Sequence, residues 1–101
     1  MVIYEVNLTV EATHAAAFEA WLPQHAHEVV ATGCFERATI YARDRADEPS
    51  DAALWTVHYL APSREALATY LRDHAPRLRQ DGLARFGAGF SASRRVLETV
   101  G

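Results

Sequence analysis

Some segments of this chain have a hydrophobic residue at every second position, and others have one at every third or fourth position. The order of these two kinds of segment is the feature that most constrains the fold. Val2 to Val10 places apolar side chains at every second position, with polar residues such as Glu5 and Asn7 between them. Such a repeat is typical of a strand with one buried face. From Thr13 to about Thr32 apolar residues recur every three or four positions, which predicts an amphipathic helix.

The ends of this helix are also marked in the sequence. Thr13 is the expected N-cap, and Gly33 is the expected stop at the C-terminal end. Pro23 lies inside the segment, where a proline removes one backbone donor and crowds the preceding turn. We therefore expect a kink or a break near Glu19 to Leu22.

Two further strands are expected after the helix. Phe35 to Ala42 alternates again between apolar and polar residues. Leu54 to Ala61 is rich in aromatic and β-branched residues, which suit a pleated surface. The charged stretch from Arg43 to Asp51 between the two strands predicts a surface loop.

The last third of the chain predicts a second helical region and a final strand. Ser63 is a good N-cap, and apolar residues continue at helical spacing as far as Leu78. Pro76 forces a kink or a restart inside this region. After a glycine-punctuated helical piece, Phe90 to Val100 predicts the last strand.

The predicted order of elements is β-α-β-β-α-β, which is the ferredoxin-like arrangement of the α+β class, formed here as a single domain over residues 1–101. Right-handed crossovers place the four strands in one antiparallel sheet of order 4-1-3-2, with both helices on a single face. The other face is left bare and partly apolar, and such a surface usually marks an interface. We therefore predict a homodimer that closes sheet to sheet through this open face.

Composition and charge exclude several classes of function. The 10 basic and 13 acidic residues give a formal charge of -3, so no global field would gather nucleic acid or anionic lipid. No stretch reaches the roughly 18 apolar residues of a membrane span. The single cysteine, Cys34, cannot form an intrachain disulfide, so a reducing cytoplasm fits best. We expect a cytoplasmic protein that binds neither nucleic acid nor a membrane.

A resemblance to a known family is carried by the opening VIYEVNLTV and by the tail SREALATYLRDHAPRLRQDGLARFGAGFSASRRVLE, from Ser63 to Glu98. Nearly the whole chain resembles DUF family 4286, a bacterial family of unknown function, with Pro23 and the Arg43 to Asp51 loop as local departures. That family resembles the dimeric α+β barrels, a superfamily that includes antibiotic-biosynthesis monooxygenases, heme-degrading monooxygenases and non-enzymatic ligand binders. The resemblance implies a dimer and a cavity between sheet and helices, but no particular reaction.

Asn7 is the first candidate ligand-binding residue. An amide in the middle of the first strand could orient an oxygenated ligand, and the heme-degrading relatives use an Asn on that strand. In the alternative, Glu5 and Asn7 are structural: they hydrogen-bond across the dimer or pair with Arg94 or Arg95.

The resemblance also brings heme into consideration. Tyr70 and His74, one helical turn apart, are the nearest matches to the aromatic residue and the ligating histidine of the heme-degrading relatives. The relatives use Trp at the aromatic position and space the histidine further along, so both identity and spacing depart from their pattern. We expect no cofactor, with heme as the minority alternative.

The lining of the cavity depends on which face of the third strand points inward. His58 shares one face with Thr56 and Leu60, and the sequence does not decide between this set and the opposite set of Trp55, Val57 and Tyr59. If His58 faces inward, it could be the general base of a cofactor-independent monooxygenase, with Asn7 and Tyr41 as donors to an enolate. In the alternative, His58 is interfacial and Tyr41 is a packing residue.

Two arginines on the predicted last strand are candidates for binding an acidic ligand. Arg94 and Arg95 are adjacent, so their side chains point to opposite sides of the sheet and cannot form one clamp. Arg94 could anchor an acidic ligand in the cavity, or one of the two could pair with Glu5 or Glu98 at the sheet surface.

The spacing of histidines argues against a metal site. His25 and His27 would lie about 200° apart on a helix and cannot chelate one ion together. His25 with Glu28 is sterically feasible, but the pair supplies too few ligands for structural zinc. We therefore expect no metal.

The sequence thus predicts a homodimer that binds a small apolar or aromatic ligand, or that serves as an assembly module. The alternative is a cofactor-independent monooxygenase of the antibiotic-biosynthesis type or, further off, a heme-binding or heme-degrading protein. The candidate ligand-binding residues are Asn7, Tyr41, His58, Tyr70, His74 and Arg94.

Overall fold

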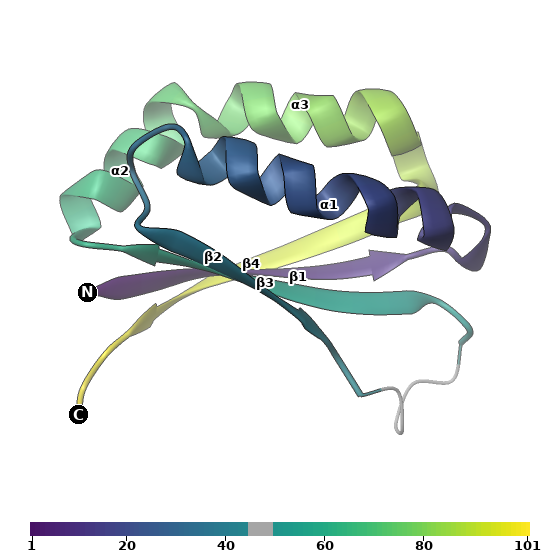
Figure 1. Ribbon diagram of the computed structural model, residues 1–101, viewed down its shortest axis with the longest axis horizontal. Helices are drawn as coiled ribbons and strands as arrows, with labels where there is room; N and C mark the ends of the chain where they lie inside the picture. Colours follow the sequence, from purple (N-terminus) through teal and green to yellow (C-terminus); the bar gives the residue numbers. More distant parts are fainter. Residues whose placement is uncertain (45–49) are drawn as a thin grey trace.

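The computed structural model describes residues 1–44 and 50–101. Its strands and helices follow the predicted order (Figure 1). They are β1 (Val2–Val10), α1 (Ala15–Val30), β2 (Arg37–Ala42), β3 (Ala53–Ala61), α2 (Arg64–Asp73), α3 (Ala75–Phe86) and β4 (Phe90–Glu98). Short 3-10 turns η1 (Ala12–His14) and η2 (Gly87–Gly89) precede α1 and β4. The centre of the loop expected at Arg43 to Asp51 lies outside the described residues.

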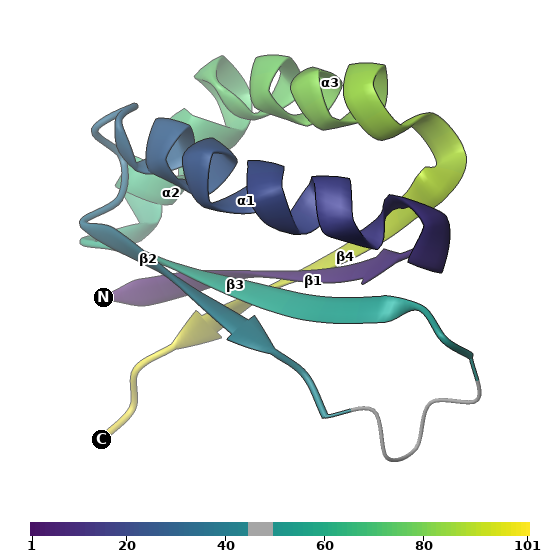
Figure 2. The same cartoon turned by 45° about the vertical axis from the view of Figure 1, so that its right-hand side comes forward.

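The four strands form one sheet in the order β2-β3-β1-β4, with antiparallel pairing throughout. This order is the predicted 4-1-3-2, and the fold class is therefore confirmed. All three helices lie over the same face of the sheet, as the two views agree (Figures 1 and 2). We call the other side of the sheet the open face.

Several predicted helix ends need correction. Thr13 is not the N-cap of α1, because it lies in the η1 turn and the helix starts at Ala15 without a side-chain cap. The helix also continues unbroken through Pro23, so of the kink or break expected near Glu19 to Leu22 the break does not occur. A proline leaves one carbonyl of the preceding turn without its backbone hydrogen bond. Contacts with neighbouring backbone and side chains can offset this cost in free energy. Gly33 follows the helix with φ 87°, a conformation that favours glycine.

The second helical region consists of two helices, α2 and α3, and Pro76 lies at the start of α3. Ser63 caps α2 as predicted, accepting a hydrogen bond from the backbone N–H of Ala66 at 3.1 Å. The chain then leaves helical geometry at His74, and Pro76 lies in the first turn of α3, where its missing N–H costs nothing. Gly82 is buried inside α3 and not in a separate short piece.

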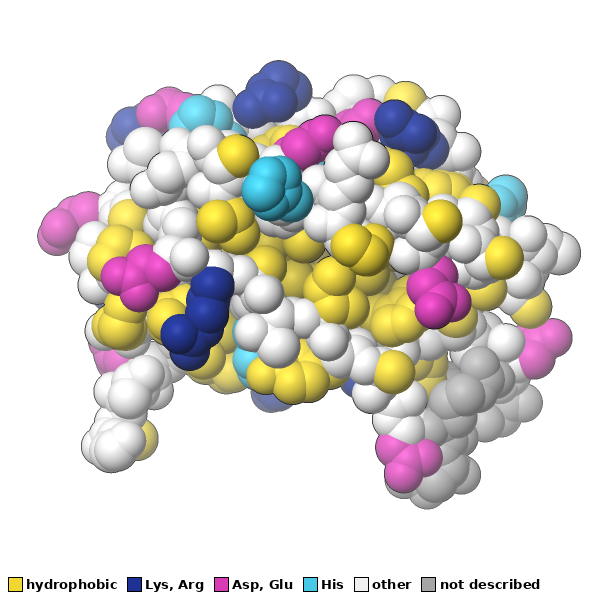
Figure 3. Space-filling view, in the orientation of Figure 1, with side chains coloured by type: hydrophobic (Ala, Val, Ile, Leu, Met, Phe, Trp, Pro, Cys, Tyr) yellow, Lys and Arg dark blue, Asp and Glu magenta, His cyan; other side chains and the backbone are white. Residues whose placement is uncertain are grey.

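The core fills the space between the sheet and the helices. In β1 the side chains of Val2, Tyr4, Leu8 and Val10 are buried there, which confirms the predicted core face of this strand. Phe18 of α1 is 1% exposed and sits at the centre of an aromatic group. Its ring stacks on that of Trp55 at 5.8 Å and contacts the rings of Trp21, Phe86 and Phe90. Hydrophobic side chains fill the band between helices and sheet in Figure 3.

Within residues 1–44 and 50–101, no helix combines the length and the hydropathy needed to cross a bilayer.

Phe18→Ala should destabilise the fold by about 3–5 kcal/mol, because it removes a fully buried ring and leaves a cavity behind. Leu71 is 38% exposed on α2 and provides the matched control. Leu71→Ala should change the free energy of unfolding by no more than about 0.5 kcal/mol. Urea unfolding of both variants measures the difference, and similar losses in the two would contradict this description of the core.

Candidate functional site

A cavity of about 260 Å³ lies between the sheet and the helices. Most of its wall is apolar and comes from side chains already placed in the core, among them Phe18, Val57 and Leu78. Apolar walls with a few polar groups are the usual make-up of a small-molecule site.

The polar groups of this cavity include three tyrosines, two arginines and His25. Tyr4 and Tyr59 project from the helix-facing side of the two central strands, and Tyr70 meets them from α2. The ring of Tyr4 lies 6.1 Å from that of Tyr59 and 5.9 Å from that of Tyr70. Arg79 of α3 donates a hydrogen bond of 2.9 Å to the Tyr4 hydroxyl, and Arg94 of β4 also borders the cavity. The cavity therefore has hydroxyl donors beside two positive charges.

The hydroxyls of Tyr59 and Tyr70 keep their protons at neutral pH. Burial raises the pKa of Tyr70 to about 12, with nearby Tyr4 adding in the same direction. Burial also raises the pKa of Tyr59, and Tyr70 and Tyr4 add to the effect. These groups can therefore donate hydrogen bonds to an oxygen atom of a ligand, but they cannot serve as bases.

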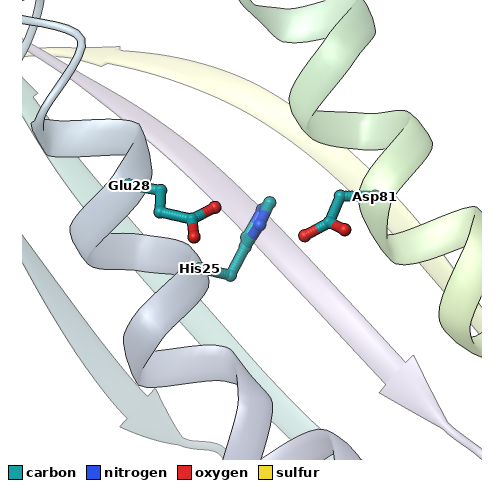
Figure 4. A group of neighbouring side chains, drawn as sticks. All are labelled: His25, Glu28 and Asp81. Carbon is teal, nitrogen blue, oxygen red and sulfur yellow. The ribbon is translucent and has the colours of Figure 1, made fainter.

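His25 lies at the border of the same cavity, in contact with Trp21 on the adjacent turn of α1. The two rings stack with centroids 4.3 Å apart and an angle of 24° between their planes. Burial lowers the pKa of His25, while the charges of Asp81 and Glu28 act in the opposite direction. The imidazole lies between these two carboxylates, one from α1 and one from α3 (Figure 4).

A separate polar network occupies the open face. Glu5 is only 4% exposed, although it lies on the side of the sheet that no helix covers. Its carboxylate accepts hydrogen bonds from Asn7 Nδ2 at 3.0 Å and from Arg95, and His58 Nε2 lies 2.9 Å from it. Asn7 in turn accepts a hydrogen bond of 2.7 Å from Thr56 Oγ1. Glu5 and Asn7 therefore make structural hydrogen bonds within one chain, including the pair with Arg95 that was the alternative to ligand binding.

The candidate residues predicted from the sequence divide between the two faces. Tyr70 and Arg94 border the cavity. Asn7, Tyr41 and His58 lie together on the open face, where the Tyr41 and His58 rings are 5.1 Å apart, so the expectation that these three line the cavity was wrong. The reason is strand parity: Val57 and Tyr59 point toward the helices, so their neighbour His58 points away.

His74, the other heme candidate, is outside the cavity lining. It lies at the junction of α2 and α3, with its ring 6.4 Å from that of Tyr70. The opposite orientations predicted for the two arginines are confirmed, since Arg95 bonds Glu5 on the open face while Arg94 borders the cavity.

Tyr59 belongs to the strand face that was the open alternative to His58, whereas Tyr4, Arg79 and His25 were not predicted to line the cavity. A signal for the tyrosines was present, because Tyr4 has the same parity as the core residues Val2 and Leu8. No comparable signal exists for Arg79, whose contact with Tyr4 joins residues far apart in the chain.

The network on the open face makes stability depend on pH. The hydrogen bond from Arg95 holds the pKa of Glu5 at about 2, below its ordinary value of 4.5, with Asn7 and His58 adding to the effect and burial opposing it. The ionised carboxylate therefore stabilises the folded state fully above pH 4.5, and this contribution is lost as pH falls from 4.5 to about 2.

Glu5→Gln should flatten the pH dependence of the free energy of unfolding in this range, because the amide has no proton to take up. Urea unfolding at a series of pH values measures the slope. Glu98→Gln provides the control, since Glu98 pairs with Arg64 at an exposed site. A slope shared by the wild type and Glu5→Gln would show that Glu5 is not the responsible group.

Solved structures share this fold at low sequence identity. A protein from Deinococcus radiodurans assigned to the antibiotic biosynthesis monooxygenases has a TM-score of 0.74 at 17% identity, over 100% of this chain and 94% of its own. SnoaB from Streptomyces nogalater, a cofactor-independent oxygenase, has a TM-score of 0.67 at 16% identity, over 99% and 95% of the two chains. A variant of MhuD with two manganese protoporphyrin IX molecules bound per active site has a TM-score of 0.67 at 19% identity, over 99% and 95%.

At these identities the similarity establishes the fold and leaves the activity open. No curated protein matches the sequence. The family described as domain of unknown function DUF4286 matches residues 1–100, and the chain belongs to that family.

Proposed function

We propose that this protein binds a small aromatic ligand with an acidic or oxygen-bearing group in the cavity between the sheet and the helices. The observation that carries the proposal is the grouping of Tyr59, Tyr70 and Arg94 at one apolar cavity of about 260 Å³. The apolar wall favours an aromatic body, and the arginine favours a negative charge.

The protonated tyrosines add selectivity for oxygen. Tyr59 and Tyr70 are donors at neutral pH because burial raises the pKa of each hydroxyl. A ligand that lacks an oxygen acceptor would leave these hydroxyls without a partner in the cavity, at a cost in binding free energy. The ligand class is therefore an aromatic acid or phenol, and its binding requires no cofactor.

We also propose a homodimer formed through the open face, in a reducing cytoplasm where Cys34 stays free. Half-buried Ile3, Leu60 and Leu97 lie side by side on this face, and Tyr41, which is 47% exposed, lies on the same face further along β2. Burying these side chains against a second copy would remove apolar area from water. The ion pair of Glu5 with Arg95 would also lose its contact with solvent.

Cofactor-independent oxygenase chemistry is the second candidate function. It is favoured by the donors at the cavity, because Tyr59, Tyr70 and Arg94 could stabilise an enolate oxygen of a bound substrate. The base expected at His58 lies on the opposite face, and His25 is the imidazole that borders the cavity. SnoaB, of the same fold, is described as an oxygenase of this type.

The residues present do not fit heme. His74, the nearest match to the ligating histidine of the heme-degrading relatives, is not part of the cavity wall.

The chain should bind 2-naphthoate, which pairs an aromatic body with a carboxylate, more tightly than neutral 2-naphthol. Arg94→Gln should weaken naphthoate binding roughly tenfold, because it removes a charged donor, and should leave naphthol binding nearly unchanged. Arg37→Gln, which changes an exposed arginine on β2, provides the matched control. Calorimetric titration gives both affinities.

A second variant tests the cavity itself. Ala92→Phe places a ring into the cavity wall and should abolish binding of both probes. Unaltered binding in Arg94→Gln and Ala92→Phe would reject the proposed location. Oxygen uptake that requires both the protein and an enolisable aromatic substrate would favour the second candidate function.

Light scattering at micromolar concentration should give about twice the chain mass of 11.2 kDa. Leu97→Asp places a charge on the open face and should shift the protein to monomer. Leu83→Asp introduces the same charge on α3, where Leu83 is 51% exposed, and should leave the dimer intact. A wild-type mass of 11.2 kDa would contradict the dimer.

A further inference from the structure

Three potential metal ligands meet between α1 and α3, at the border of the cavity. His25 and Glu28 lie three residues apart on α1 and therefore share one side of that helix. Asp81 reaches them from α3. One ligand atom of each residue lies within 4.8 Å of the others, and the imidazole sits between the two carboxylates (Figure 4).

The local packing fixes this arrangement. The ring of Trp21 stacks on His25 and holds the imidazole in place. Gly82, next to Asp81, lets α3 approach α1 closely, since a Cβ atom there would lie 3.2 Å from the indole of Trp21. The missing side chain of Gly82 thus brings the Asp81 carboxylate to the histidine.

A second, independent observation is a nitrogen atom of His25 that makes no hydrogen bond to the described residues. His25 Nδ1 is buried and has no hydrogen-bond partner among the described residues. Buried polar atoms nearly always have a partner, and a bound water or ion is one explanation of an exception. Two carboxylates on either side of a neutral ring also leave negative charge that a cation would neutralise.

We propose that His25, Glu28 and Asp81 bind a divalent transition-metal ion of the Zn²⁺ type. One imidazole nitrogen and two carboxylate oxygens are ordinary zinc ligands. Two bonds of about 2.1 Å span at most about 4.2 Å, so side chains within 4.8 Å need only small rotations to close on an ion. Three protein ligands leave at least one coordination position open beside the cavity.

Asp81 already has one competing partner. Arg85, one turn further along α3, lies 3.4 Å from its carboxylate, and both side chains are partly exposed. Exposed pairs of this kind contribute little to stability, so a divalent ion can displace the guanidinium. Asp81 supplies the third ligand that His25 and Glu28 lack by themselves. A bound ion would also prevent His25 from acting as a base.

The test is calorimetric titration of the EDTA-treated full chain with ZnCl₂. We expect uptake of one Zn²⁺ per chain. Asp81→Asn and Glu28→Gln should each weaken binding by roughly ten- to hundredfold. Arg85→Gln should tighten it, because that variant removes the competing cation; a merely structural role of Asp81 would not produce this gain.

Matched controls lie on the same helix. His27→Gln and Glu19→Gln change exposed residues of α1 outside the cluster and should leave the affinity unchanged. Thermal unfolding in EDTA verifies that each variant folds, and a given Zn²⁺ concentration should raise the unfolding temperature of the wild type more than that of Asp81→Asn. Absence of saturable uptake, or equal affinity in the wild type, Asp81→Asn and Glu28→Gln, would overturn the proposal.

Discussion

The pairing of β1 with a strand on each side is the constraint on which the rest of the structure depends. Because successive side chains of a paired strand point to opposite faces, β1 divides its residues into two sets that cannot meet. Tyr4 and Leu8 enter the core below the helices, while Glu5 and Asn7 face away from it. The neighbouring strands follow the same division through their register, which sets Tyr59 beside Tyr4 and His58 beside Glu5.

Two chemically different sites result from this division. On the helix side, tyrosine hydroxyls and the Arg94 guanidinium border an apolar cavity, an arrangement suited to an aromatic acid or phenol. On the open side, a buried carboxylate is held by Arg95, Asn7 and His58. The first arrangement has room for a ligand, whereas the second already satisfies its own polar groups and therefore fits a structural role.

Much of the fold was predictable because the periodicity of the sequence is strong. The element order, the sheet order and the core face of β1 follow from alternation and from turn residues, and the Ser63 cap and the restart at Pro76 follow from local chemistry. The start of α1 was missed, and the break expected as one outcome at Pro23 does not occur, because tertiary packing overrides local signals at helix ends and at an isolated proline. The fold was thus predictable from patterns that lie within short segments.

The site was less predictable because its residues come from distant segments. Sequence spacing could pair His25 with Glu28, but it could not bring in Asp81 from another helix. Likewise, the inward face of β3 depends on burial and not on its sequence alone, so His58 was a candidate for the wrong side of the sheet.

The most direct test of the proposed function is to locate bound 2-naphthoate by nuclear Overhauser contacts between its ring protons and methyl groups of the protein. Binding in the cavity predicts contacts to Val57 and Leu78, which line it. Contacts confined to Ile3 and Leu60 on the open face would contradict it.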